Sequence, residues 1–469
     1  MNTATDGKGK GGNLDINADE SIEIIGDKSV LTTLSGSNST GDAGDLNIQT
    51  NRLMVKDGTV SSETSGAGKG GNLSVFAQMI ELDGANNEFE TVLSTVSREE
   101  ATGNAGNLNI QTNRLVVKDG ALATTSTLGK GKGGNLDINA DESIEIIGER
   151  SFLTTLSGEN STKGSGDLNI QTNRLLVKDG ALVSTDTTGK GKGGNLTINA
   201  RETIELDGAY NQSDTGLSTI SREEATGNAG DLSIQTGRLV VKDRASATTS
   251  TLGKGKGGNL KIQTGELLLR NLAGVFTNTF DEGKGGNLDI NASESVEINA
   301  ISLLSTSSSS QLNLAGDAGD LNINTNTLRV NQGAVSVESI GQGNAGDLNI
   351  NVNSLRLNNN ARVSADTQSV NKDPSNPQAN ININSQDLIL RRNSNITTNA
   401  RGQDVIGGNI NIDAGVLAGF EDSNITANSQ DFRGGNVRIE TQGIFGMQFR
   451  EQDLPQTSDV TATGATNDL

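Results

Sequence analysis

The sequence predicts an all-β protein, a right-handed, three-sided parallel β-helix of about 15 coils. Three observations predict this fold. A short motif of small and apolar residues recurs about every thirty residues along the chain. Within each repeat, apolar and polar residues alternate with the period of two that is typical of half-buried strands. The chain also has 60 glycines but only 3 prolines, which fits frequent turns and excludes collagen-like or proline-rich chains.

The repeat unit is a small residue, Gly, Asn or Asp, and then an apolar, a polar and an apolar residue. It begins as GGNLDI at Gly11 and AGDLNI at Ala43, and it recurs in 15 copies spaced by 27 to 36 residues. Because one coil cannot cover its own apolar side, such repeats fold by stacking on one another. The first apolar residues of the copies are Leu14, Leu46, Leu73, Leu108, Leu136, Leu168, Leu196, Leu232, Leu260, Leu288, Leu321, Leu348, Ile381, Ile410 and Val437.

A larger duplication lies on top of this repeat. The four copies that begin at Leu14 return at Leu136, displaced by 122 to 124 residues, and the segment SREEATGNAG occurs from both Ser97 and Ser221. The duplicated block therefore holds four coils.

Each coil resolves into three runs that we expect to be strands. One example is NLNIQT from Asn107, RLVVKDG from Arg114 and ALATTST from Ala121, followed by a GKGKGG turn. Alternation places Leu108 and Ile110 inside the coil and the polar residues between them outside.

The Asn or Asp before each first apolar residue belongs to a turn. Asn and Asp side chains bond to local backbone and tolerate left-handed conformations beside glycine. We expect Asn13, Asp45, Asn72 and Asn107 to stack as a ladder along the coils.

The regularity of the repeat divides the chain into three segments. Residues 1–300 form the regular helix with the duplicated block, and residues 301–442 form diverged coils with a proline-containing loop near 371–377. Residues 443–469 hold an aromatic-containing segment, GIFGMQFREQDLPQ, and a truncated last coil. We expect the aromatic segment to fill a gap or to bind a partner.

Both ends of the chain match internal parts of the repeat. The opening NTATDGKGKGGNL matches STDTTGKGKGGNL from Ser184, so we expect Met1 to lie in a third strand. The segment SDVTATGA from Ser458 matches SNITTNA from Ser394 in the same way. We therefore expect a fragment of a longer protein, without an export signal of its own.

Composition lowers the expectation of catalysis. The chain has no Cys and no His, so it lacks disulfides, thiolate metal sites and the usual general base, and Tyr210 is its only tyrosine. The net charge of −20 and the dispersed Lys and Arg residues disfavour nucleic acid as a partner. No apolar run approaches the length of a membrane span.

Parallel β-helices also include polysaccharide lyases and hydrolases, so we considered an enzyme. Two carboxylates are the minimum for such chemistry. Asp281 with Glu282, and Glu421 with Asp422, are the pairs that could serve, although neighbours on a strand point to opposite faces. Solvated turn charges explain them better.

Three motifs are similar to ligand-binding motifs, but a structural role explains each of them more simply. GKGKGG lacks the spacing of a phosphate loop and fits turn chemistry. GDAGDLNI is similar to calcium-binding nonapeptide repeats, but its period is about thirty residues instead of nine. TTST from Thr124 suggests an ice-binding threonine array, although inward-facing threonines explain it better. The sequence thus identifies no catalytic, cofactor-binding or metal-ligating residue.

Several motifs together carry a family resemblance. GGNLDI at Gly11, RLVVKDGA from Arg114, the third-strand signature at Ser394 and GIFGMQFRE from Gly443 resemble the haemagglutinin-repeat exoproteins of cyanobacteria. These are related to the filamentous haemagglutinins of two-partner secretion, and the resemblance covers essentially the whole chain. It implies a secreted β-helix, exported through an outer-membrane β-barrel transporter, that acts in adhesion, aggregation or biofilm formation.

The leading hypothesis is therefore a structural and adhesive shaft, not an enzyme, at the cell outer surface or in the medium. Surface carbohydrate or other cells are its expected partners. The alternative is a carbohydrate-active β-helix enzyme, which would need a groove with carboxylates that break the repeat.

Overall fold

In the computed structural model the chain forms two compact units. Unit 1 comprises Met1–Gly237, Arg244–Ala247 and Leu252–Gly255, and unit 2 comprises Arg238–Asp243, Thr248–Thr251 and Lys256–Leu469. Over the described residues the secondary structure is strand, bridge, turn and bend, without helix. The described residues are 1–26, 28–84, 91–209, 214–309, 316–341, 343–369, 379–402, 404–451, 454 and 456–465.

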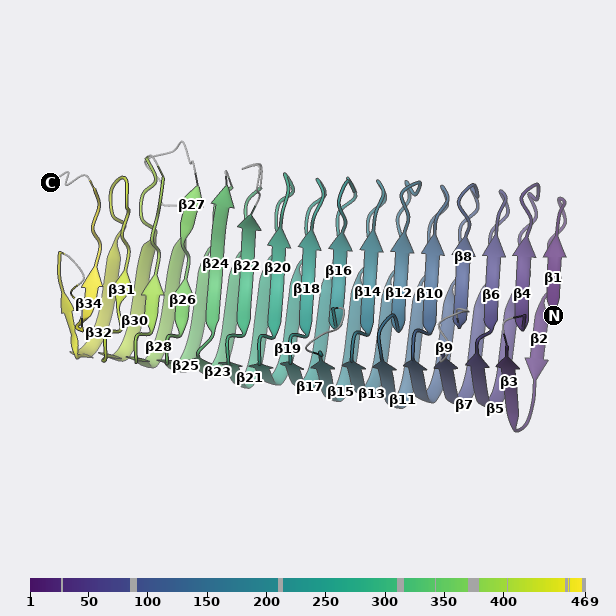
Figure 1. The fold of residues 1–469 in the computed structure, drawn as a ribbon, viewed down its shortest axis with the longest axis horizontal. Coiled ribbons are helices and arrows are strands. Elements are labelled where there is room, and N and C mark those ends of the chain that lie inside the picture. Colours follow the sequence, from purple (N-terminus) through teal and green to yellow (C-terminus); the bar gives the residue numbers. More distant parts are fainter. Residues whose placement is uncertain are drawn as a thin grey trace. The chain divides into compact units, whose positions relative to one another are not determined.

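Unit 1 contains two parallel sheets. Each strand pairs with its equivalent in the next turn and not with the strand that follows it along the chain (Figure 1). The sheet of long strands holds β2 (Leu14–Asn17), β3 (Ser21–Ile25), β5 (Leu46–Lys56), β7 (Leu73–Asp83), β9 (Leu108–Lys118), β11 (Leu136–Ile147), β13 (Leu168–Lys178) and β15 (Leu196–Asp207). The sheet of short strands holds β1 (Asn2–Thr5), β4 (Val30–Ser35), β6 (Thr59–Thr64), β8 (Val92–Ser97), β10 (Leu122–Thr127), β12 (Phe152–Ser157), β14 (Leu182–Thr187) and β16 (Gly216–Ser221).

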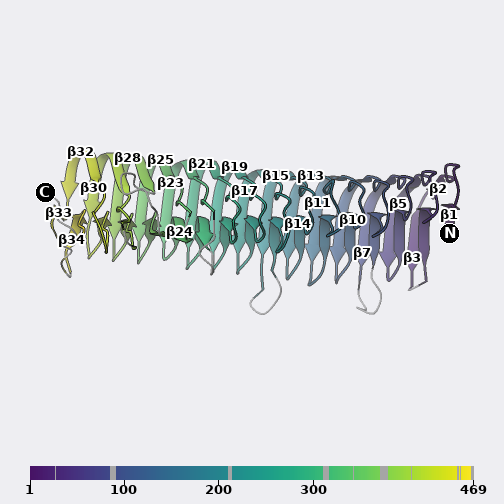
Figure 2. The same cartoon turned by 90° about the horizontal axis from the view of Figure 1, so that it is seen from above.

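Unit 2 repeats this plan. Two strands, β17 (Leu232–Lys242) and β18 (Ser246–Thr251), contribute residues to both units. The long strands of unit 2 are β19 (Leu260–Arg270), β21 (Leu288–Asn299), β23 (Leu321–Asn331), β25 (Leu348–Asn358), β28 (Asn380–Arg391), β30 (Asn409–Gly419) and β32 (Val437–Phe445). The short strands are β20 (Gly274–Thr279), β22 (Leu303–Ser309), β24 (Ala334–Gly341), β26 (Arg362–Ser364), β27 (Thr367–Ser369), β29 (Asn395–Thr397), β31 (Ile425–Thr426), β33 (Met447–Phe449) and β34 (Ser458–Thr461). Within each unit the two sheets form separate layers (Figure 2).

The prediction of an all-β parallel solenoid is confirmed, with about 14 turns in the two units together. The structure shows two sheets, because the first two predicted runs of each coil after the first join into one long strand, and in the first coil they form β2 and β3 of the same sheet. In β5 the buried side chains are Leu46, Ile48 and Thr50 and then Leu53 and Val55, so the inward phase shifts by one residue within the strand. The three-sided outline and the right-handed winding stay predictions.

The core of each unit is a set of ladders of identical or similar apolar residues. Leu108 pairs with Leu136, and Ile110 pairs with Ile138, in register on neighbouring turns. All four are at most 2% exposed, while Asn109 is half-buried on the other face, as the alternation predicts. Full burial of one such side chain stabilises a fold by roughly 1.5–3 kcal/mol.

The turn before each long strand contains the predicted Asn/Asp ladder. The Asn13 Oδ1 accepts the backbone N–H of Asp45 at 3.0 Å, the Asp45 Oδ1 accepts that of Asn72 at 2.8 Å, and the series continues to Asn107. Because each rung only needs an acceptor oxygen, Asn and Asp serve equally well. This explains why the two residues alternate freely at the position.

Inward hydroxyls bond to the glycine-rich turns. The Thr125 hydroxyl donates to the Gly134 carbonyl at 2.6 Å, and Thr127 donates to Gly131 at 2.9 Å. Both threonines are fully buried, which confirms the inward-facing interpretation of TTST from Thr124. The GKGKGG segment is a turn that these hydroxyls hold in place.

The end segments behave as strands of the repeat. Strand β1 pairs with β4, and β34 pairs with β31, in the sheets formed by the third runs. In the aromatic-containing segment, Met447 is buried, whereas Phe445 and Phe449 are 55% and 64% exposed. The predicted proline-containing loop near 371–377 lies outside the described residues. The division at 300 and 442 stays a prediction.

Candidate functional site

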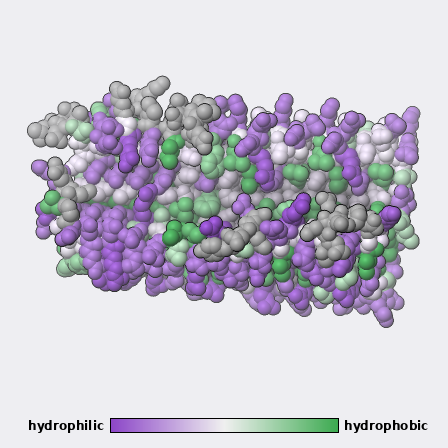
Figure 3. Space-filling view, in the orientation of Figure 1, coloured by the Kyte–Doolittle hydropathy of each residue, from purple (hydrophilic) through white to green (hydrophobic). Residues whose placement is uncertain are grey.

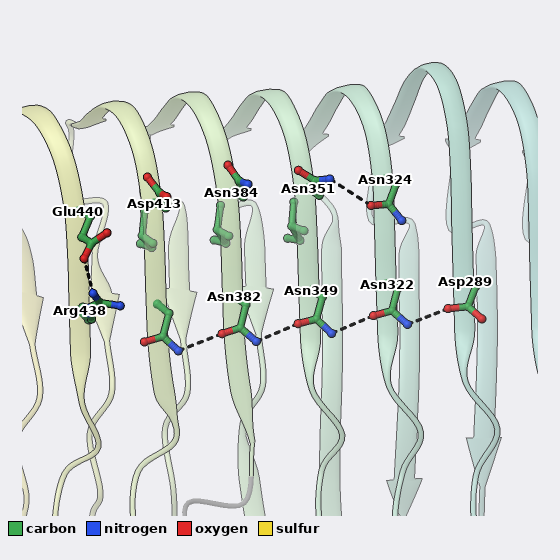
Figure 4. A pocket seen from close by; sticks show the side chains of 14 residues that line it. Asp289, Asn322, Asn324, Asn349, Asn351, Asn382, Asn384, Asp413, Arg438 and Glu440 are labelled. Carbon is green, nitrogen blue, oxygen red and sulfur yellow. Dashed lines mark hydrogen bonds and ion pairs between the residues drawn. The ribbon is translucent and has the colours of Figure 1, made fainter.

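The most distinctive surface of the molecule is the outer face of the long strands of unit 2. A first amide column consists of the residue between the two inward apolar residues on successive strands. Its Nδ2 groups donate to the Oδ1 of the preceding strand at 2.7 to 2.9 Å, as Figure 4 shows. The first amide column is Asp289, Asn322, Asn349, Asn382 and Asn411.

A second amide column runs beside the first, two residues further along each strand. It consists of Asn291, Asn324, Asn351 and Asn384, and the first three are joined by bonds of 3.1 and 3.4 Å. The second amide column is exposed, whereas Asn322, Asn349 and Asn382 of the first are half-buried. The first column therefore supports the sheet, and the second faces solvent.

All residues of these columns except Asn291 line a groove of about 570 Å³. A third pair of amides, Asn326 and Asn353, is bonded at 2.6 Å on the same face. The groove ends at Arg438 and Glu440 of β32, which form an ion pair with each other. A dense hydrophilic patch covers this part of unit 2 in the space-filling view (Figure 3).

The Asn side chains of the second amide column keep some hydrogen-bond donors and acceptors that a ligand could use. An Asn side chain has two N–H donors and two acceptor lone pairs. A rung such as Asn324, bonded to both neighbours, spends one donor and one lone pair inside the column. At least one N–H and one lone pair per rung remain, at the 4.7–4.9 Å spacing of neighbouring strands. The face can thus donate to and accept from a bound molecule at regular intervals.

The corresponding face of unit 1 is mixed in character. Phe76 is 43% exposed there and lines two smaller hollows of about 350 and 390 Å³. Beside it, Glu81 bonds to Lys118 at 2.9 Å and to Arg52 at 3.0 Å. The hydrogen bond from Lys118, with help from Arg52, holds the pKa of Glu81 below its ordinary value. Unit 2 has similar ion pairs further along its long strands, between Arg329 and Glu297 and between Arg356 and Asp387, so the difference between the faces lies in Phe76 and the amides.

The carboxylate pairs that the sequence offered for catalysis lie in turns. Asp281 and Glu282 follow β20, and the Asp281 carboxylate accepts the Glu282 backbone N–H at 2.8 Å. Glu421 and Asp422 follow β30 with φ values of 61° and 62°, and Glu421 bonds to Arg391 at 3.1 Å. That bond and the guanidinium charge hold the pKa of Glu421 below its ordinary value. The turn geometry and the ion pair account for these residues.

Two carboxyl groups at the short-strand sheets have raised pKa values: Asp186 is buried on β14 of unit 1, and Asp366 is half-buried between β26 and β27 of unit 2. Burial raises the pKa of Asp186, although the Arg222 guanidinium lies 2.6 Å away and partly opposes the shift. Burial also raises the pKa of Asp366, against the opposing effect of the backbone N–H of Asn399 at 2.7 Å. Each carboxylate has a local charged or polar partner, and neither lies in the amide groove.

Over the described residues, no group of three or more His, Cys, Asp or Glu side chains is arranged to hold a metal ion. Tyr210 lies outside the described residues. Among those described, no helix is long and apolar enough to span a membrane.

Sequence reasoning missed the amide groove. Its signal is present in the sequence as LNINTN from Leu321 and LNINVN from Leu348, where three outward positions in succession are Asn. The apolar positions define the repeat and fix the fold, and the polar residues between them differ from copy to copy along the chain.

Comparison of the chain with protein-family models, with curated proteins and with solved structures found no match in any of the three. The fold and the geometry of the groove are therefore the grounds for a functional proposal.

Proposed function

We propose that this chain is the structural and adhesive shaft of a secreted or cell-surface exoprotein of the filamentous haemagglutinin-like kind. The observation that carries the proposal is the amide groove of unit 2, where the second amide column repeats one exposed side chain on four consecutive long strands. Repetition of one contact suits attachment to an extended surface, because many weak contacts add up when they are linked.

The proposed setting follows from the sequence resemblance. The full-length protein would be exported through an outer-membrane two-partner-secretion transporter and would hold surface carbohydrate or other cells. The stacked turns support a mechanical role, since each turn pairs with the next along most of its long strand. Such a ladder resists extension across many hydrogen bonds at once.

Cell fractionation followed by an adhesion assay tests this function. An antibody raised against the chain should detect a band well above 48.5 kDa in the medium or outer-surface wash of cells that carry the gene. Beads coated with the purified chain should then bind those cells more than beads coated with albumin. A product confined to cytosol, or equal binding by both kinds of bead, would reject the adhesive role.

A carbohydrate-active enzyme is the second candidate, and one feature of the groove favours it. Asp413 and Glu440 are register partners on β30 and β32, so two carboxylates lie side by side at one end of the groove. Paired carboxylates are the requirement for glycoside hydrolysis. Release of reducing ends from polysaccharides, lost in D413N and E440Q, would favour the enzyme over the shaft.

A further inference from the structure

We propose that the second amide column is a binding site for an uncharged, hydroxyl-rich polysaccharide chain that lies along the stacking direction of unit 2. This inference rests on the proposed adhesive function and names the class of its ligand. It depends on the residues Asn291, Asn324, Asn351 and Asn384, which the long strands place on one exposed line.

Hydrogen-bond chemistry selects hydroxyl groups. Each rung of the column keeps at least one N–H donor and one acceptor lone pair, and a hydroxyl group can use both because it donates one bond and accepts two. A carboxylate, sulfate or phosphate group only accepts, so it would leave the lone pair of each rung without a donor. A carbohydrate hydroxyl can accept a bond from the remaining N–H of a rung and can donate a bond to its remaining lone pair.

Charge selects against ionic polymers. The four side chains of the column are neutral, and the nearby acidic groups, Asp289, Asp413 and Glu440, would repel a polyanion. Arg438 is the one cationic side chain that lines the groove, and its ion pair with Glu440 already occupies it. The net charge of −20 acts in the same direction.

The column is already ordered before any ligand arrives. Bonds from Asn324 to Asn291 and from Asn351 to Asn324 fix the amide planes. Bonds of 2.7 to 2.9 Å order the neighbouring first amide column in the same way, from strand to strand. Fixed side chains lose little conformational entropy on binding, which is one of the main costs of recognising a flexible polymer.

Periodicity favours a polymer over a single sugar. Rungs on adjacent strands are 4.7–4.9 Å apart, so one monosaccharide reaches only one or two of them. A chain that lies along the column engages several rungs together, and its later contacts form within an already bound molecule. We therefore expect free monosaccharides to compete poorly.

The test is binding of the full chain to immobilised uncharged glucans, mannans, xylans and galactans, each paired with its sulfated derivative. At least one uncharged polymer should bind, with an affinity that changes little between 50 and 500 mM salt. The variant N324A/N351A should bind it about tenfold more weakly, because two rungs are removed. Binding of sulfated polymers only, or of no polymer, would overturn the proposal.

The matched control is Q171A/N199A, which removes exposed amides from the equivalent position of β13 and β15 in unit 1. It should keep wild-type binding within about twofold. If both variants lost the same amount of affinity for the polysaccharide, the second amide column would not be the binding site. Thermal unfolding confirms that each variant folds. Should N324A/N351A not fold, N351D serves instead, because it keeps the side-chain shape while removing a donor and adding a charge.

The same variants separate this proposal from the adhesive function. If N324A/N351A loses glycan binding but wild-type beads do not hold cells, the column binds polysaccharide and the adhesive role is wrong. If the variant beads hold cells as well as the wild type, the shaft is adhesive through another surface and the column is not its receptor site.

Discussion

The long-strand sheets of the two units have the same buried face but different exposed faces. In both units a Leu and an Ile alternate inward on successive strands, as at Leu168 and Ile170 in unit 1 and at Leu348 and Ile350 in unit 2. All four are at most 2% exposed. At the outward position of the second amide column, unit 1 mixes Phe76 with Gln and Asn, whereas unit 2 repeats Asn on four consecutive strands. The buried positions fix the fold, and the outward positions are free to acquire a function.

A ladder of side chains forms only where consecutive turns carry residues of the same length. In unit 1 the position of the second amide column reads Gln111, Asn139, Gln171 and Asn199 on successive strands. Gln and Asn differ by one methylene, so their amides do not meet at the same height above the sheet. Unit 2 repeats Asn at that position, and the amides of Asn291, Asn324 and Asn351 bond from strand to strand.

The largest expected effect concerns the turns, where the two units should behave alike. A Cβ at Gly194 in unit 1 would collide with the Gly166 carbonyl oxygen, and a Cβ at Gly346 in unit 2 would collide with that of Gly319. Overpacking against backbone costs roughly 1–3 kcal/mol or more. G194A and G346A should each increase hydrogen exchange in their own unit, measured peptide by peptide. A strong effect in only one unit would show that the turns are not equivalent.

The next effect concerns the buried hydroxyls. Thr185 of unit 1 donates to the Gly194 carbonyl at 2.6 Å, and Thr277 of unit 2 donates to Gly286 at 2.7 Å. Replacing either with Val keeps the shape but leaves a buried carbonyl without its donor, which costs about 1–3 kcal/mol. T185V and T277V should therefore lower the denaturation midpoint of their units by similar amounts. T188V in unit 1 is the control and should change little, because the Ser157 carbonyl that accepts the Thr188 hydroxyl at 3.2 Å keeps the backbone N–H of Thr188 as a donor.

A smaller effect separates the two kinds of ladder. In the first amide column Asn382 donates to Asn349 and accepts from Asn411, so N382D removes a donor and costs about 1 kcal/mol. In the turn ladder Asn107 only accepts the backbone N–H of Asn135, so N107D should be nearly neutral. Urea denaturation of both variants checks the difference. Equal costs would mean that charge, and not donor loss, controls both positions.

The sequence predicts the buried half of this protein well. The inward positions of residues such as Leu108 and Ile110, the Asn13 ladder and the strands at both ends all follow from period-two alternation and fixed spacing. The number of sheets does not follow. Whether two runs bend into one strand or separate into two depends on backbone geometry near Thr50, which period-two patterning does not specify.

The candidate site was less accessible to sequence reasoning. Outward asparagine at Asn324 looks locally like any solvated polar residue, and its significance depends on the registry that sets it beside Asn291 and Asn351. To predict that register, one must know which residues of consecutive turns stack directly on one another. Loops of variable length conceal it in the linear sequence, because the spacing between copies ranges from 27 to 36 residues.

The smallest expected effect is a pH dependence that differs between Asp186 in unit 1 and Asp366 in unit 2. Burial raises the pKa of both carboxyls, so each folded carboxyl holds its proton at pH values where the unfolded chain has lost it. The free energy of unfolding should therefore fall as pH rises above about 4, the ordinary value for Asp.

D186N removes this titration, and it removes a buried carboxylate oxygen that has no hydrogen-bond partner. The variant should be more stable than the wild type at pH 7, by up to about 1 kcal/mol, and the difference should vanish near pH 4. D366N should gain less, because the Asn399 backbone N–H stabilises the charged form of Asp366. Thermal unfolding from pH 4 to pH 7 measures both differences. A loss of stability in D186N at pH 7 would mean that the ion pair with Arg222 outweighs the burial of the carboxylate.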